Sequence, residues 1–149
     1  MPAHMRKSAV LSNGSLAVGL NEQGLVSDFY YPYVGQQNLT NSRRRPHYIG
    51  VWVDGEFSWI HEDKGWFIEV RNSEDALQAH CTYRHDGLGV ELTTTDFVDP
   101  KYDIFRRQVN ITNVSDQDKE IRLFFYQTFR LSQDGRTDTV LYVPDDHYI

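Results

Sequence analysis

Apolar and polar residues alternate along most of the chain with a period of two. In the run 15–20, for example, Leu16, Val18 and Leu20 share one side while small residues occupy the other. Because successive side chains of a strand point to opposite faces, this alternation predicts β-strands rather than helices. We predict strands at the short, even spacing of a sandwich, over residues 15–20, 25–31, 49–53, 56–60, 66–70, 77–84, 89–97, 103–112, 120–131 and 139–143.

The clearest hairpin spans residues 48–60, where Asp54-Gly55 separates two apolar runs. A two-residue Asp-Gly loop suits a type I′ turn, in which both central residues need positive φ. Only residues 72–79 have a tolerable helix pattern, and they soon run into β-forming residues. The sequence therefore predicts an all-β, antiparallel sandwich, with residues 1–149 forming a single segment.

The run 120–131 differs from the others because neither of its faces is purely polar. One face carries Ile121, Leu123, Phe125 and Phe129, with Gln127 interrupting the apolar row. The opposite face mixes aromatic, polar and cationic residues: Arg122, Phe124, Tyr126, Thr128 and Arg130. Such a second face suggests a large sheet with something packed against it.

Composition narrows the classes of partner. The 149 residues fit one domain, and 21 acidic against 15 basic residues give a net charge of −6. That charge argues against nucleic acid or an anionic membrane as a partner. The single cysteine, Cys81, allows no intrachain disulfide. No window approaches the roughly 20 apolar residues of a membrane span, and residues 1–8 do not resemble a signal peptide. We therefore expect a cytoplasmic protein.

Short motifs give little evidence of a catalytic site or a cofactor. The run Arg43–Arg45 before Pro46 is interpreted as a solvated loop, with phosphate binding as the alternative. His80 and Cys81 are adjacent, but neighbouring strand residues point to opposite faces, so we predict no metal site and no cofactor. Carboxylates merit attention because sugar hydrolysis uses a pair of them. The candidate pairs are Glu62 with Asp63, Asp96 with Asp99, and Asp145 with Asp146.

Aromatic residues are the other candidates for binding. Three tyrosines surround a proline in a predicted turn and are hard to bury together unless another domain covers them. We therefore take this loop as a domain-interface or sugar-contact candidate. Its residues are Tyr30, Tyr31, Tyr33, Gln36 and Asn38. Trp52 and Trp59, in the predicted hairpin, are expected to pack within the sandwich.

Several blocks of the sequence occur in an order that resembles a known family. They are LSNGSLAVGL at 11–20, GLVSDFYYPYVGQQN at 24–38, HYIGVWVDGEFSW at 47–59, DFVD at 96–99, IFRRQV at 104–109, NVSD at 113–116 and RLFFYQTFR at 122–130. They resemble the start of bacterial and archaeal glucoamylase-like proteins of glycoside hydrolase family 15, which include glucodextranase relatives. The resemblance covers nearly the whole chain.

The resemblance implies an N-terminal antiparallel supersandwich of the galactose-mutarotase-like type. In the family this domain precedes an (α/α)₆ barrel that carries two catalytic glutamates and hydrolyses α-glucosidic bonds with inversion. Neither glutamate has a counterpart here, so no catalytic residue is assigned. The family's sandwich is also longer, which implies an incomplete one here. Because an open sheet edge invites pairing with another chain, we expect self-association through that edge.

Three functions remain open from the sequence. The first is a non-catalytic domain that braces the catalytic barrel of an α-glucan hydrolase, with the tyrosine loop facing the barrel. The second is a free-standing carbohydrate-binding module for α-glucan oligosaccharides. The third is a structural or oligomerisation domain without a ligand. The chain alone is expected to be inactive.

Overall fold

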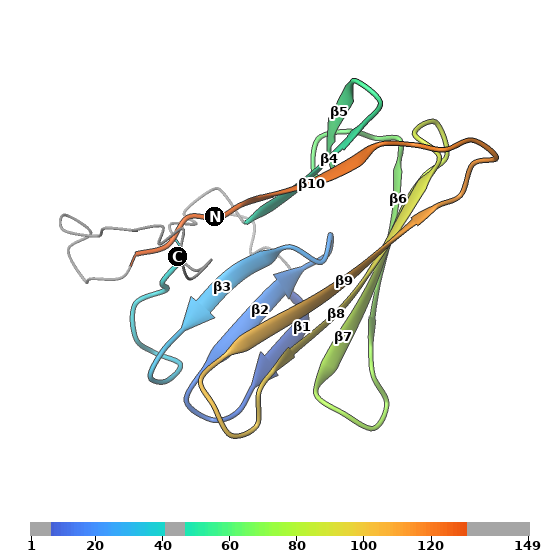
Figure 1. The fold of residues 1–149 in the computed structure, drawn as a ribbon. Coiled ribbons are helices and arrows are strands. Elements are labelled where there is room, and N and C mark those ends of the chain that lie inside the picture. Colours follow the sequence, from blue (N-terminus) through green and yellow to red (C-terminus); the bar gives the residue numbers. More distant parts are fainter. Residues whose placement is uncertain (1–6, 41–46, 131–149) are drawn as a thin grey trace, which may run out of the picture.

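The computed structural model describes residues 7–40 and 47–130, and over these ranges it contains strands and no helix (Figure 1). Three sequence-based interpretations lie outside the described residues: the Arg43–Arg45 run, the strand 139–143 and the pair Asp145 with Asp146. The strands are β1 (Lys7–Ser12), β2 (Ala17–Asn21), β3 (Val26–Tyr30), β4 (Tyr48–Val53), β5 (Glu56–Trp59), β6 (Trp66–Asn72), β7 (Gln78–His85), β8 (Val90–Val98), β9 (Phe105–Asn113) and β10 (Ile121–Tyr126).

The strands form three antiparallel sheets, in the orders β1-β2-β3, β10-β4-β5 and β6-β7-β8-β9. The prediction of an all-β antiparallel fold is confirmed. Figure 1 shows the first and third sheets facing each other, with the β10-β4-β5 sheet at one end of the molecule. Within the described ranges, no helix has the length and apolarity needed to cross a bilayer.

The predicted hairpin between β4 and β5 is confirmed in detail. Val53 pairs with Glu56, and the two loop residues between them, Asp54 and Gly55, have φ values of 48° and 103°. Both values are positive, as a type I′ turn requires. The local sequence was therefore sufficient to predict this element.

The strands differ from the predicted ones in two places, at residues 7–12 and at residues 120–131. Residues 7–12 form β1, which the polar N-terminal start concealed, and its inward side chains Ala9 and Leu11 are buried. Residues 72–79, which have a weak helix pattern, form the end of β6, a loop and the start of β7. The predicted strand 120–131 is shorter, since β10 ends at Tyr126 and only an isolated bridge between Thr40 and Phe129 follows.

One apolar core lies between the sheets. Its largest fully buried side chains include Leu11, Leu20 and Leu25 of the first sheet region and Tyr83 and Leu92 of the third sheet. Strand β8 shows the expected alternation, with every second residue from Val90 to Val98 buried. Each fully buried aliphatic side chain stabilises the fold by roughly 1.5–3 kcal/mol. Ile49, Val51 and Val53 bring the inner face of β4 into the same core.

Candidate functional site

The tyrosine loop begins where β3 ends and presents two aromatic rings to solvent. Tyr31 and Tyr33 are 47% and 54% exposed, whereas Tyr30 is half-buried. The Gln36 side-chain amide donates a hydrogen bond of 2.6 Å to the Tyr33 hydroxyl, and the Gln36 N–H bonds to the Tyr33 carbonyl. Burial, followed by the Asp28 carboxylate, raises the pKa of Tyr30. The loop is thus an exposed aromatic surface with an internal brace.

Asn38 anchors the other end of this loop. Its Oδ1 accepts the N–H groups of Phe29 and Thr40, each at 3.0 Å, and its Nδ2 donates to Asp28 Oδ1 at 2.8 Å. The Leu39 N–H also bonds to the Phe29 carbonyl at 2.7 Å. The structure therefore brings Tyr33 and Gln36 together and gives Asn38 a structural role. Whether the loop contacts a domain or a sugar stays a prediction.

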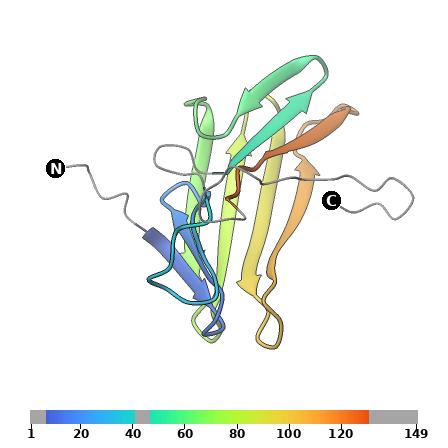
Figure 2. The same cartoon turned by 90° about the vertical axis from the view of Figure 1, so that its left-hand side faces the viewer.

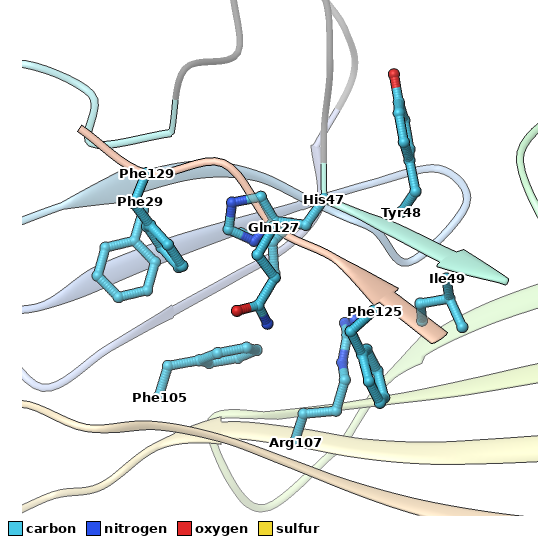
Figure 3. Close-up of a pocket in the computed structure, with 10 residues that line it drawn as sticks. Phe29, His47, Tyr48, Ile49, Phe105, Arg107, Phe125, Gln127 and Phe129 are labelled. Carbon is cyan, nitrogen blue, oxygen red and sulfur yellow. The ribbon is translucent and has the colours of Figure 1, made fainter. Parts of the chain in front are cut away.

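A cavity of about 300 Å³ opens between β3, β4, β9 and β10 (Figure 3). Its walls are mostly aromatic, and Phe29 and Phe129 meet edge to face with ring centroids 5.6 Å apart. The lining residues are Val26, Phe29, His47, Tyr48, Ile49, Phe105, Arg107, Phe125, Gln127 and Phe129. Aromatic walls with few polar groups are typical of binding pockets. We call this feature the seam pocket.

The polar groups of the seam pocket carry no acid–base pair. Arg107 donates to both oxygens of the buried Asp96 and to the Gly24 carbonyl, so its charge is compensated. His47 Nε2 lies 3.1 Å from the Thr128 carbonyl, and burial lowers its pKa. Gln127 directly follows β10, and its amide points toward Phe105 in Figure 3. The pocket can therefore hold an apolar group, and its one permanent charge, on Arg107, is already paired with Asp96.

Sequence reasoning did not find the seam pocket, although one signal was present. Gln127 interrupts the apolar face of its run, and the structure places it in this pocket. The remaining lining residues come from segments far apart in the chain, whose meeting depends on how the sheets pack.

The described carboxylates that were candidates for catalysis have structural roles. Asp99 accepts the N–H groups of Lys101 and Tyr102, which, with Arg106, lower its pKa and shape the loop before β9. Asp96 lies in the core with Arg107. Glu62 contacts the His61 ring, and Asp63 contacts the His85 ring.

Ser58, Asp63 and His85 meet beneath Trp66, a grouping that sequence reasoning missed. Ser58 Oγ donates to Asp63 Oδ2 at 2.7 Å, and His85 Nε2 lies 3.1 Å from the same oxygen. In a catalytic triad the serine donates to the histidine, and the carboxylate holds the other ring nitrogen. Here the His85 Nδ1 accepts the Leu88 N–H instead. Ser58 therefore donates to a carboxylate and not to a histidine, so the triad arrangement is not formed, and Asp63 also accepts the Gly65 N–H of the turn.

His80 and Cys81 lie on opposite faces of β7, as predicted. His80 is exposed and 3.2 Å from the Thr95 hydroxyl, while Cys81 is buried. Among the residues that the structure describes, no group of three or more histidine, cysteine, aspartate or glutamate side chains could hold a metal ion.

The expectation that Trp52 and Trp59 pack within the sandwich is wrong. Both are half-buried on the outer face of the β10-β4-β5 sheet, opposite Ile49 and Val51. The Arg122 guanidinium lies 4.8 Å from the Trp52 ring centroid. Both faces of this hairpin are apolar, so alternation alone could not say which face is inside.

The aromatic outer face of this sheet is continuous. The rings of Phe57 and Trp59 lie over Gly50, where an added Cβ would come within 2.6 Å of Phe57 Cζ. The Phe57 ring also meets Phe124 edge to face at 5.5 Å between centroids. Phe57 and Phe124 are 43% and 44% exposed, so part of this face is open to a ligand or partner.

Comparison with known proteins gives a relation to a glycosidase. No protein-family model and no solved structure matches the chain. Over 136 residues, 91% of this chain, it is 26% identical to a protein of Methanocaldococcus jannaschii named as an uncharacterized glycosyl hydrolase. The chain spans about a fifth of that relative, 21% of its length. The likeness supports a relation of this sequence to glycosidases.

Proposed function

We propose that this chain is a non-catalytic β-sandwich segment of a glucoamylase-like glycosyl hydrolase of family 15, and that it braces the catalytic barrel. The observation that carries the proposal is the similarity over 91% of the chain to a fifth of a protein named a glycosyl hydrolase. The blocks at 11–20, 24–38 and 47–59 support the finer assignment by their resemblance to that family. The described candidate carboxylates, which are tied up in turns and ion pairs, agree with a supporting role.

The tyrosine loop is the proposed contact with the barrel. Tyrosine rings supply large apolar area and a polar tip, and such residues are enriched at the centres of protein interfaces. The bonds of Gln36 and Asn38 hold the loop in one shape before it binds. Preorganisation of this kind lowers the entropy lost on association.

The first test is hydrolytic activity. The purified chain, incubated with maltooligosaccharides, is expected to release no glucose. Turnover that co-purifies with the chain and disappears on Asp63→Asn or Asp99→Asn would contradict a supporting role.

The second test is binding to the catalytic part. The portion of the M. jannaschii relative beyond the matched fifth would be titrated with this chain by calorimetry. We expect saturable binding, weakened about 30-fold or more when Tyr31→Ser and Tyr33→Ser remove two interface anchors. Tyr102→Ser is the matched control, since Tyr102 is 63% exposed in a different loop. No binding, or equal weakening by the control, would refute the contact.

A carbohydrate-binding module is the second candidate, and the aromatic outer face of β4, β5 and β10 is the observation that favours it. Flat aromatic rings on a sheet can stack on the apolar faces of sugars. Titration with maltooligosaccharides would then quench or shift tryptophan fluorescence from Trp52 and Trp59, and Trp59→Ala would weaken the response. If no saturable response appears, this candidate is removed.

A further inference from the structure

The outer edge of β9 carries a row of backbone groups without partners among the described residues. The Val114 N–H bonds to the Gly89 carbonyl and the Asp99 N–H to the Ile104 carbonyl, each at 2.9 Å, which fixes the phase of the β8–β9 ladder. In antiparallel pairs, bonded and non-bonded positions alternate. The residues of β9 whose N–H and C=O groups therefore point away from β8 include Phe105, Arg107, Val109 and Ile111.

The side chains of the same four residues point into the sandwich, and the apolar surface on this side is partly exposed to solvent. Phe105 and Arg107 line the seam pocket, and Ile111 is 40% exposed. Across the seam pocket, Phe125 and Phe129 are 48% and 39% exposed. A strand added to β9 would satisfy its backbone and cover these apolar groups in one step, which is the geometry of β-strand addition.

Strand β9 lacks most of the features that usually protect a sheet edge. Its two arginines are the exception, and the inward-pointing one, Arg107, is already paired with Asp96. The nine residues of β9, FRRQVNITN, contain no proline or lysine, and the register with β8 is continuous. By contrast, β1 at the edge of the first sheet has Lys7 and a bulge, and β5 has four residues. Long, regular edges without lysine, proline or bulges readily pair with another chain. Figure 2 shows β9 (orange) as the outermost strand of its sheet.

We propose that β9 pairs antiparallel with β9 of a second copy, forming a twofold dimer centred on Val109. A strand and its own copy are related by a twofold axis in this arrangement, so the contact closes after two chains. The unpaired backbone groups of Arg107 then meet those of Ile111 in the second copy. On the outward face, Gln108 lies opposite Asn110 and Arg106 opposite Thr112, so no like charges meet. The surface is separate from the tyrosine loop, and this inference does not rest on the proposed function.

The test is sedimentation of the full 17.4 kDa chain over a range of concentrations. We expect a reversible equilibrium between one and two copies. The double variant Gln108→Lys with Asn110→Lys places like charges opposite each other twice and should raise the dissociation constant about tenfold or more. Gln108→Lys with Asn110→Glu places opposite charges face to face and should restore dimerisation. All these side chains are exposed, so circular dichroism should remain unchanged.

The charge control is Gln117→Lys with Leu77→Lys, two exposed positions outside β9 that add the same charge. It should dimerise like the unaltered chain. A monomer at every concentration, as expected if another segment already covers β9, overturns the proposal. The proposal is also overturned if the dissociation constant is unchanged in both β9 variants, or if the control variant changes it equally.

Discussion

Arg107 grips the carboxylate of Asp96 with two parallel hydrogen bonds, Nε to Oδ1 at 2.7 Å and Nη2 to Oδ2 at 2.6 Å. The two residues are direct partners in the β8–β9 ladder. The Arg107 side chain is 11% exposed and that of Asp96 is 0% exposed, so the pair lies almost entirely in the core. Burial opposes the charge on Arg107, but the Asp96 carboxylate outweighs it and raises the pKa of the guanidinium. Through its bond to the Gly24 carbonyl, Arg107 also links the third sheet to the turn before β3.

Removing one partner of this ion pair should destabilise the folded chain. Arg107→Met leaves the Asp96 carboxylate buried without its partner, and we expect a loss of about 3–5 kcal/mol in the free energy of unfolding. Urea denaturation followed by tryptophan fluorescence measures the change. The double variant Asp96→Leu with Arg107→Met should recover most of the loss, because apolar groups of similar volume often replace a buried ion pair without penalty.

Arg106→Met is the matched control for that experiment. Arg106 pairs with Asp99 at 3.2 Å, but its side chain is 51% exposed. Exposed pairs contribute less than about 1 kcal/mol. Equal destabilisation by the Arg106 and Arg107 variants would show that the buried pair has no special role.

The sequence made Asp96 a candidate carboxylate, paired with Asp99, but it could not supply the partner that the structure shows. The spacing between Asp96 and Arg107 is compatible with several ladder registers, and only the turn at 99–104 fixes the observed one. The register makes Asp96 half of a structural pair with Arg107.

Features that depend on neighbouring residues could be predicted from the sequence, whereas features that depend on tertiary packing could not. The Asp54-Gly55 hairpin was predictable because its turn and both strands are adjacent in the chain. The seam pocket was not, because Phe29 and Phe105 come from different sheets whose packing no local pattern encodes. The tyrosine loop was found for its composition, and the structure confirms that Tyr31 and Tyr33 are exposed.

Gly24 should tolerate no side chain. Its φ is +69°, and a Cβ there would lie 2.3 Å from the Tyr83 hydroxyl and 2.6 Å from Cys81 Sγ. Gly24→Ala should therefore lower the free energy of unfolding by about 1–2 kcal/mol through backbone strain and by about 1–3 kcal/mol more through overpacking. Thermal denaturation by circular dichroism measures the loss. Gly55→Ala has a positive φ but no atom within 4 Å, so it should cost less. The reverse order would contradict the packing around Gly24.

The Asp63 carboxylate should make the free energy of unfolding depend on pH in the acidic range. The Ser58 hydroxyl, then the Gly65 N–H, and His85 hold the pKa of its carboxyl below its usual range. Because the folded pKa lies below the unfolded value of about 3.9, the carboxylate's contribution is present above that value. The contribution is lost as pH falls through the folded pKa. Urea denaturation at a series of acidic pH values should show a decline that is shallower in Asp63→Asn.

Glu74→Gln is the control for the acid series, since Glu74 makes no hydrogen bond or ion pair with any described residue. This variant should keep the full pH dependence of the unaltered chain. A decline of the same steepness in Asp63→Asn would mean that other carboxylates, and not Asp63, dominate the acid response.

Cys81 should be an unreactive thiol while the chain is folded. It is 1% exposed, and burial raises its pKa, so little of the nucleophilic thiolate forms. We expect slow labelling by iodoacetamide in buffer and rapid labelling in urea, followed by mass spectrometry. Because labelling requires an opening of the β7–β8 region, Arg107→Met should accelerate it, whereas Arg106→Met should not. Labelling of the unaltered chain as fast as in urea would show that the Cys81 thiol is accessible and that the core around Asp96 is not closed.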